Sequence, residues 1–440
     1  MHLLPLLALV SVALATPLTP QQLAFQSPSF SSLLPSNLPT SISSSLLSRL
    51  STLPSTHLEQ LQSHINEWTE PRLVQLRATD GQAGETLNLS EGQKSLLTFA
   101  GIRYIDITNY SPSSETSSPS ITSSPYPSHL SHNSTSLSPL LESISLPSIS
   151  TFLKRFTSFH TRYYRSQSGR DSQLFLLEHL KEIHSSSSSK KKNHKFSNVT
   201  FTEFDHEWVQ KSIIVRWEPV IKSANYSGEV VILSAHQDST NSLPFLPAPG
   251  ADDDASGTVT LIETFTQLVN HGLVPRTNPI EFHFYSAEEG GLLGSGEIAK
   301  KYRDEGKKVK GMFHMDVVAY IKPGTEPVIG MITDGTDRDL VEFMKLVVDE
   351  YATIPYAETQ CGYGCSDFAS FTKNGYRSTC LAEGKFADSN PNMHSMGDTM
   401  EAKGYSLEHI REFVRVAIGY AVELGGMEKS SKRDGRWRME

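Results

Sequence analysis

The sequence is poor in cysteine, in positive charge and in long apolar runs, and each shortage narrows what the protein can be. Its three cysteines among 440 residues fit an oxidising compartment, with one disulfide and one thiol left over. Lys and Arg number 39 against 48 Asp and Glu, a net charge of −9, which argues against a nucleic-acid partner. Beyond the first residues, no stretch is apolar enough to cross a bilayer, so we expect a soluble mature protein without a membrane partner.

The one apolar run lies at the start of the chain. MHLLPLLALVSVALA, residues 1–15, ends in an A-x-A-like site, which is typical of a secretory signal peptide although His2 stands where Lys or Arg is usual. A membrane anchor is the alternative, but about 15 apolar residues are too few to span comfortably. We therefore expect a secreted, extracellular protein. Some of its N-x-[ST] sequons should then be glycosylated, and these begin at Asn88, Asn109, Asn133, Asn198 and Asn225.

The cysteines fall into a pair and a single residue. Cys361 and Cys365 lie in CGYGC, close enough to close a small loop. Cys380 lies in the apolar stretch YRSTCLA, and we expect a buried free thiol there. A CxxxC pair could instead bind zinc, but no second cysteine pair or nearby histidine completes such a site.

Residues 16–125 differ in composition from the rest of the chain. Ser and Pro crowd residues 27–56 and 111–149, which lack the periodicity of a packed core. Between these stretches, 57–77 has the pattern of an amphipathic helix, and 93–108 that of a helix followed by a strand. A small folded unit ahead of a larger one in a secreted chain indicates a pro-segment, with a permanent N-terminal domain as the alternative.

Residues 126–427 alternate between strand and helix patterns. EVVILSAH, from residue 229, is a near-continuous apolar run of strand length, typical of a central strand covered on both faces. Further strands are expected in NPIEFHFYSAEE, from residue 278, and VKGMFHMDVVAY, from residue 309, with helical patterns between them. This alternation predicts an α/β fold with a mostly parallel central β-sheet flanked by helices. The charged tail, 428–440, is expected to be loose.

Polar residues follow the ends of these strands. In α/β folds, ligands bind beyond the carboxyl ends of the strands, where the exits gather on one rim. A single histidine there is more often structural than a ligand, an adjacent Glu pair is usually on the surface, and Asp254 could be an ordinary helix N-cap. A whole acidic set is different, because its carboxylates would repel unless a cation compensated. The residues expected on the rim are His236, the triplet Asp252–Asp254, the pair Glu288–Glu289, Asp316 and His394.

This set of residue types predicts metal ions. Two histidines with several carboxylates and no thiolate suit zinc or another borderline divalent cation. One catalytic zinc needs three protein ligands, whereas five good candidates are present, which favours two zinc ions that share a carboxylate and a water. The shared carboxylate should come from the Asp252–Asp254 triplet. In the pair Glu288–Glu289, one residue can bind metal while the other takes a proton from the water, and the residues alone leave the division open.

Five motifs together carry a family resemblance. GADDDASG, YSAEEGGLLGS, HMDVVAY, CGYGCSD and NMHSMGDT resemble those of the secreted, co-catalytic two-zinc aminopeptidases, most closely the fungal leucine aminopeptidases with a removable pro-segment. The resemblance runs from about residue 155 to residue 425. It implies hydrolysis of the first peptide bond of peptides with a free N-terminus, with leucine and other large apolar residues preferred. We expect a monomer.

The resemblance also implies a role for each residue of the rim. Asp253 would bridge the two zinc ions and be followed by a cis peptide bond. His236 would bind one zinc, while Asp316 would complete the coordination of the other with His394. In the Glu pair, Glu288 would be the general base and Glu289 a metal ligand.

Three further roles follow from the same resemblance. Asp238 would orient the imidazole of His236, as the second ring nitrogen of a metal-bound histidine generally requires. The pair Cys361–Cys365 matches the short disulfide of the family, and Tyr363 inside it would face the substrate.

Two other functions are compatible with a fold of this kind. A glutaminyl cyclase uses a single zinc and lacks the complete two-metal set, so the presence of His236 together with Asp316 argues against it. A non-enzymatic ectodomain acting as a binding module normally loses several ligands, and none of the five is lost here.

Overall fold

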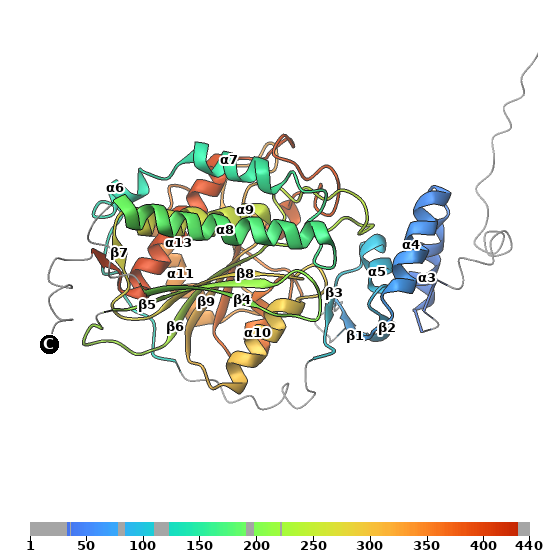
Figure 1. The fold of residues 1–440 in the computed structure, drawn as a ribbon, viewed down its shortest axis with the longest axis horizontal. Coiled ribbons are helices and arrows are strands. Elements are labelled where there is room, and N and C mark those ends of the chain that lie inside the picture. The colour runs from blue at the N-terminus through green and yellow to red at the C-terminus, as the bar shows by residue number, and fades with distance from the viewer. Residues whose placement is uncertain are drawn as a thin grey trace, which may run out of the picture.

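The computed structural model describes residues 33–35, 37–77, 84–109, 123–190, 198–220 and 222–429. The signal peptide predicted for residues 1–15 lies outside these ranges. Figure 1 shows a large α/β unit and, against one side of it, a small unit formed by the N-terminal part of the chain.

In its described residues, the N-terminal unit combines three helices with an antiparallel sheet of order β2-β1-β3. Its helices are α3 (Thr40–Leu50), α4 (Ser55–Glu67) and α5 (Lys94–Ala100). Its strands are β1 (Pro71–Leu76), β2 (Thr86–Ser90) and β3 (Tyr104–Asp106). The helix-then-strand pattern of residues 93–108 is thereby confirmed.

Two expectations for this unit are wrong. The helix predicted for residues 57–77 ends at Glu67, because Pro71 cannot continue a helix, and β1 follows. The Ser/Pro-rich stretch 27–56 does contribute to a core: Leu46 and Leu50, one helical turn apart on α3, are fully buried.

The α/β unit is built on an eight-stranded sheet of order β11-β10-β12-β9-β6-β8-β5-β4. Strand β6 pairs in parallel with β8 and β9, and the pairs β9/β12 and β10/β11 are also parallel. The pairs β4/β5, β5/β8 and β10/β12 are antiparallel, so the sheet is mostly parallel, as predicted. The strands are β4 (Asn198–Phe204), β5 (Ser212–Glu218), β6 (Val230–His236), β8 (Ile280–Tyr285), β9 (Val309–Met315), β10 (Ile329–Ile332), β11 (Tyr356–Thr359) and β12 (Ser378–Ala382).

Helices cover both faces of this sheet, which explains why every residue of β6, β8 and β9 is buried. One face packs against α7 (Leu146–Phe156), α8 (Gln167–Lys190), α9 (Ala255–Asn270), α11 (Arg338–Tyr351) and α13 (Leu407–Gly425). The other packs against α10 (Leu293–Asp304) and α12 (Phe368–Lys373). Smaller elements are α6 (Ser138–Leu141) and the 3-10 turn η2 (Phe386–Asp388).

The tail is anchored at its first residues, contrary to the expectation for 428–440. Strand β13 (Glu428–Lys429) pairs antiparallel with β7 (Leu273–Val274), next to the buried Met427. The remainder of the tail lies outside the described residues.

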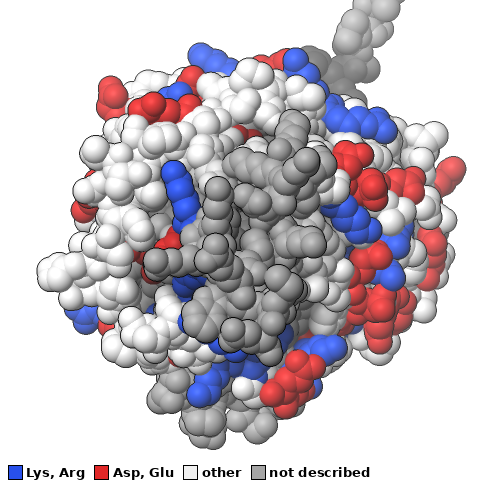
Figure 2. All heavy atoms as spheres, turned by 60° about the vertical axis from the view of Figure 1, so that its left-hand side comes forward, with Lys and Arg blue, Asp and Glu red and all other residues white. Residues whose placement is uncertain are grey.

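The five N-x-[ST] sequons lie on the surface of the structure. The side chains of all five sequon asparagines are exposed. On the face shown in Figure 2, acidic side chains gather toward the right, with basic side chains among them. Within the described ranges, no helix combines the length and the apolar character needed to cross a membrane.

Three parallel strands set the position of the rim. His236 is the last residue of β6, Glu288 follows shortly after the end of β8 at Tyr285, and Asp316 directly follows β9. Because β8 and β9 flank β6 and run parallel to it, these exits meet at one edge of the sheet.

Candidate metal centre

Two groups of metal-ligating side chains share one carboxylate. The first consists of His236, Asp253 and Asp316, and the second of Asp253, Glu289 and His394; in each, the ligand atoms lie within 4.8 Å of one another. His236 Nε2 is 3.2 Å from Asp253 Oδ1, whereas His394 Nε2 is 3.1 Å from Asp253 Oδ2. The two imidazoles thus face different oxygens of Asp253, as a carboxylate that bridges two cations requires.

The structure corrects one expected pairing. Asp316 was expected beside His394, but its Oδ1 lies 3.4 Å from His236 Nε2. The cause is the strand order, since β9 carries Asp316 to the side of β6 and hence to His236. His394 instead comes from a loop, with its backbone at a φ of 56°, and its Nε2 lies 3.0 Å from Glu289 Oε2.

The turn after β6 is held by Asp254, the N-cap of α9. Its carboxylate accepts hydrogen bonds from the backbone N–H groups of Gly257 (2.8 Å), His236 (3.2 Å) and Val317 (3.3 Å). One side chain therefore ties together the helix start and the exits of β6 and β9. The peptide bond between Asp253 and Asp254 is cis, as the resemblance implied.

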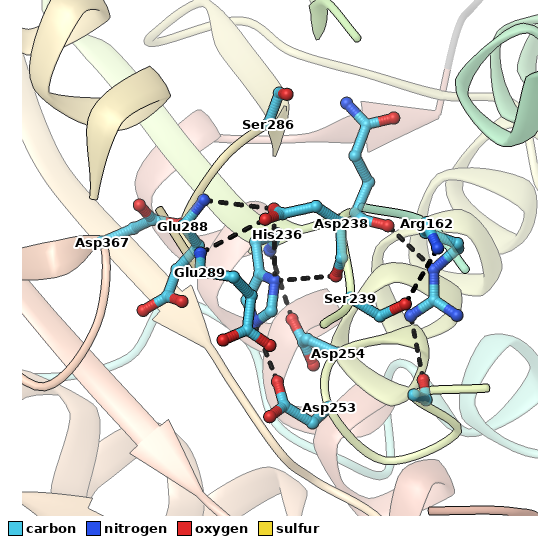
Figure 3. A network of polar contacts seen from close by, with 12 residues as sticks. Arg162, His236, Asp238, Ser239, Asp253, Asp254, Ser286, Glu288, Glu289 and Asp367 are labelled. Atoms are coloured by element: carbon cyan, nitrogen blue, oxygen red, sulfur yellow. Dashed lines mark hydrogen bonds and ion pairs between the residues drawn. The ribbon is translucent and has the colours of Figure 1, made fainter. Parts of the chain in front are cut away.

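Asp238 contacts both His236, at the end of β6, and the Glu288–Glu289 pair that follows β8, as Figure 3 shows. His236 Nδ1 lies 3.1 Å from the backbone carbonyl of Asp238 and 3.5 Å from its carboxylate. A proton on Nδ1 leaves the Nε2 lone pair free to bind a cation. The Asp238 carboxylate also accepts hydrogen bonds from the backbone N–H groups of Glu288 (3.1 Å) and Glu289 (3.2 Å). Asp238 thus orients the histidine mainly through its carbonyl, and fixes the Glu pair with its side chain.

The electrostatics of the rim show a shortage of positive charge. Burial raises the pKa of Glu288 well above its usual range, and that of Glu289 as well. Burial opposes the charged form of His394, but Glu289 and Asp253 outweigh it and raise the pKa of His394 to about 10. The His236 Nε2 and Glu289 Oε1 atoms are buried without a hydrogen-bond partner in the described chain. Divalent cations would satisfy these atoms, so the residues fit a metal pair.

Comparison with known proteins assigns the family. The family model for peptidase family M28 matches residues 213–419, a stretch that contains all five candidate ligands. Leucine aminopeptidase 1 of Coccidioides posadasii (strain C735) is 39% identical over 355 residues, which cover 78% of this chain and 88% of the relative. The chain belongs to peptidase family M28. Leucine aminopeptidase 1 of Colletotrichum graminicola is 40% identical over 351 residues, covering 78% of this chain and 84% of that relative.

A solved structure shares the fold. The aminopeptidase LapA of Legionella pneumophila superposes with a TM-score of 0.69 and 21% identity, over 83% of this chain and all of LapA. Together with the fungal relatives, the M28 match identifies this chain as a peptide hydrolase of the aminopeptidase class.

The active site of this M28 peptidase opens into a cavity of about 270 Å³. Glu288, together with the candidate ligands Asp253, Glu289, Asp316 and His394, lines one part of it. Another part of its wall is largely apolar and includes Ile332, Cys380, Ala382, Phe386 and Met393. Residues of the N-terminal unit complete the wall: Thr98, Gly101, Ile102, Arg103 and Tyr104.

The disulfide loop stands in this wall as expected. Cys361 and Cys365 are bonded, and Cys380 is free and buried. Tyr363 lines the cavity, and burial raises the pKa of its hydroxyl to about 12, so the phenol stays protonated. Arg77 of the N-terminal unit lies 5.2 Å from the centre of the Tyr363 ring.

Sequence reasoning missed a carboxylate that holds the bridging residue. Asp398 accepts hydrogen bonds from the backbone N–H groups of Asp252 (3.1 Å) and Asp253 (3.0 Å), and Asn390 Nδ2 donates to Asp252 Oδ2 at 3.0 Å. Burial raises the pKa of Asp398 to about 8. Its place in the motif NMHSMGDT, four residues after His394, was the available signal.

Arg162 was missed as well. Its buried guanidinium donates to the backbone carbonyls of Gln237 (2.8 Å), Gly250 (2.9 Å) and Pro249. It thereby closes the loop that runs from the exit of β6 to the acidic triplet. Arg162 lies in the stretch FTSFHTRYYRS, where no chemical pattern distinguishes it from its neighbours.

Proposed function

We propose that this M28 peptidase is an extracellular two-zinc aminopeptidase that releases N-terminal residues, with leucine and other large apolar residues preferred. The observation that carries the proposal is Asp253, whose two oxygens face one histidine each. Each imidazole with its carboxylates supplies three protein ligands, the number that a catalytic zinc site uses. When bound, two zinc ions would polarise the scissile carbonyl and acidify a water molecule.

Glu288 is the general base in this proposal. It lines the cavity but belongs to neither ligand group, so its carboxylate remains available to a proton. Asp238 fixes its backbone, and burial raises its pKa, which makes it a stronger proton acceptor than an exposed glutamate. Glu288 would take a proton from the attacking water and deliver it to the departing amine.

The cavity supports the choice of substrate. Its apolar lining residues, among them Ile332, Ala382 and Phe386, suit a large apolar side chain, whereas the carboxylates that line the same cavity attract a free α-ammonium group. The fungal relatives are leucine aminopeptidases by name. Extracellular location is supported by the signal-like residues 1–15, the disulfide and the exposed sequons.

The N-terminal unit acts as a pro-segment in this proposal. Arg103 and Tyr104 line the same cavity as Glu288 and Glu289, so the N-terminal unit occupies part of the wall around the proposed substrate site. We therefore expect the protein to be less active until the N-terminal unit, predicted as residues 16–125, is removed. Residues from Ser123 onward nevertheless pack on the α/β unit, since Ser124 donates to Glu229 and Tyr126 to the carbonyl of Lys310.

Two measurements on protein freed of the N-terminal unit test the function. Elemental analysis should find two zinc ions per chain, and leucine-p-nitroanilide should be cleaved faster than the glutamate analogue. A single zinc ion would contradict the bridging role of Asp253. Two zinc ions without hydrolysis of any aminoacyl-p-nitroanilide would contradict the enzymatic proposal and favour a binding module.

A further inference from the structure

A buried cluster of charges joins the N-terminal unit to the α/β unit. Glu91 Oε2 lies 2.7 Å from Arg72 Nε, 2.9 Å from Lys94 Nζ and 3.4 Å from an Arg165 nitrogen. Asp106 Oδ2 accepts a hydrogen bond from Lys94 at 2.9 Å. Each of these five residues is at most 8% exposed, and Arg165 alone belongs to the α/β unit. We call this set the anchor cluster.

The anchor cluster continues into the backbone of the active site. Lys94 Nζ donates to the carbonyl of Gly290 at 2.8 Å, and the backbone N–H of Asp106 donates to the carbonyl of Gly291 at 3.1 Å. Gly290 directly follows the Glu288–Glu289 pair. Gly291 has a φ of 99°, and a Cβ there would lie 2.8 Å from the backbone nitrogen of Asp106. A side chain at residue 291 would collide with Asp106, so this close contact between the two units requires glycine at that position.

Apolar contacts extend this interface on both sides of the charges. Leu46, Leu61 and Leu96 of the N-terminal unit share a core with Leu243 of the α/β unit. Nearer to the cavity, Ile105 belongs to the same buried apolar cluster as Cys361. The guanidinium of Arg165 lies 4.4 Å from the ring centre of Trp68.

None of these contacts depends on the chain that connects the two units. The contacts named above come from residues within 37–77 and 84–109, whereas the described chain from residue 123 has contacts of its own on the α/β unit. Lys310 Nζ donates to the carbonyls of Ser124 and Pro125, both at 2.8 Å, and the Tyr126 ring stacks on Phe343 at 5.5 Å. A cut between residues 110 and 122 would break one covalent connection and leave these contacts in place.

We propose that residues 33–109 remain bound to the α/β unit after such a cut, as a non-covalent inhibitor held by the anchor cluster. The inference rests on the proposed pro-segment and adds that cleavage by itself leaves the site covered. Opening the site requires a second event, either dissociation or destruction of the bound segment.

The test uses the full chain with a site for a sequence-specific protease introduced between residues 112 and 120. After complete cleavage, the N-terminal fragment should co-elute with the α/β unit in gel filtration at micromolar concentration, and leucine-p-nitroanilide hydrolysis should stay at the level of the uncut chain. Separation of the fragment without denaturant, or full activity upon cleavage alone, would overturn the proposal.

Variants on the catalytic side test the anchor cluster. Arg165→Ala should weaken binding of the fragment more than tenfold, because it leaves Glu91 with less compensation. Tyr164→Phe removes the hydroxyl that donates to Glu91 and should have a smaller effect of the same sign. The matched control is Arg411→Ala, an exposed arginine paired with Glu408. Equal fragment binding by the Arg165 and Arg411 variants would contradict the anchoring role.

Co-elution is measured independently of activity, so failure of the two proposals can be told apart. If the isolated α/β unit, obtained after the fragment is stripped away, hydrolyses no aminoacyl substrate, the proposed function fails. Retention of the fragment by the cut protein is not affected by that result.

Discussion

The anchor cluster and the metal rim are both buried and rich in carboxylates, yet their charges are balanced differently. In the anchor cluster, Lys94, Arg165 and Arg72 outweigh the effect of burial and lower the pKa of Glu91 to about 2. On the rim, burial raises the pKa of Glu288 and Glu289. The carboxylate ligands are in direct contact with two imidazoles, and Arg103 of the N-terminal unit adds one positive charge from the cavity wall. The first cluster carries its own cations, whereas the second has the composition of a site that receives them from solution.

This difference separates two roles for buried charge. A cluster that carries its own cations contributes to the position of the segments it joins. A cluster that lacks positive charge is costly in the empty protein, and that cost favours cation binding. Variants in the two clusters should therefore have different effects: those on the rim should change zinc binding and turnover, and those in the anchor cluster the retention of the N-terminal unit.

The largest effect is expected for Glu288→Gln. The variant keeps the shape of the side chain and both ligand groups but cannot accept a proton, so kcat should fall about 10³-fold or more while two zinc ions remain bound. Steady-state kinetics and elemental analysis of the freed α/β unit measure both quantities. Glu342→Gln, which removes an exposed carboxylate beside Lys345, is the control and should leave both unchanged. A near-normal kcat for Glu288→Gln would exclude it as the base.

In the anchor cluster, Glu91→Gln should destabilise the N-terminal unit by about 3 kcal/mol, because Lys94, Arg72 and Arg165 lose their common carboxylate while remaining buried. Hydrogen exchange of the β1 and β3 amides measures this local stability. Glu358→Gln, which removes an exposed carboxylate paired with Lys345, should cost no more than about 1 kcal/mol. Loss of zinc binding in Glu91→Gln would show that the two clusters are not independent.

Much of the rim could be predicted from the sequence, because parallel strands with apolar runs end at one edge, and His236, Glu289 and Asp316 lie at those ends or shortly after them. The pairing of Asp316 could not, since it depends on the order of strands in the sheet rather than on their order in the chain. The expected partner, His394, lies on a loop, and a periodic pattern of residues cannot predict where a loop lies.

The anchor cluster could not be predicted from the sequence for a related reason. Glu91 and Arg165 come from separate units, and neither lies in a periodic pattern of apolar residues that would predict its burial. The same holds for the end of the helix predicted to run to residue 77, where Pro71 was the overlooked signal. Local periodicity predicted single elements, whereas contacts between distant polar residues required the fold.

A smaller effect on the rim is expected for Asp398→Asn. The Asp398 carboxylate accepts a hydrogen bond from both backbone N–H groups, of Asp252 and of Asp253. An amide has one oxygen and an NH₂ group that cannot accept, so one of these two N–H groups would lose its acceptor in the variant. Asp253 would then be less well positioned, and zinc affinity should fall about 10- to 100-fold. Competition with a chromophoric chelator measures the affinity, and Asp388→Asn, at a surface pair with Lys322, is the control. Unchanged affinity would show that Asp253 is fixed without Asp398.

The smallest effect concerns the pH dependence of the N-terminal unit. Burial lowers the pKa of His64 to about 4, from a usual value of 6.5, and its ring lies 6.1 Å from that of Tyr163 in the α/β unit. A lowered pKa means that the folded state disfavours the proton, so this stability is present above pH 6.5 and is lost as the pH falls toward 4. Between pH 7 and pH 5.5 the loss should reach about 1 kcal/mol. His64→Gln should flatten the dependence, measured by hydrogen exchange of α4 at both pH values. If the stability of the N-terminal unit still falls between pH 7 and pH 5.5 in that variant, acid acts through another group. The neutral His64 would then have no part in retaining the segment.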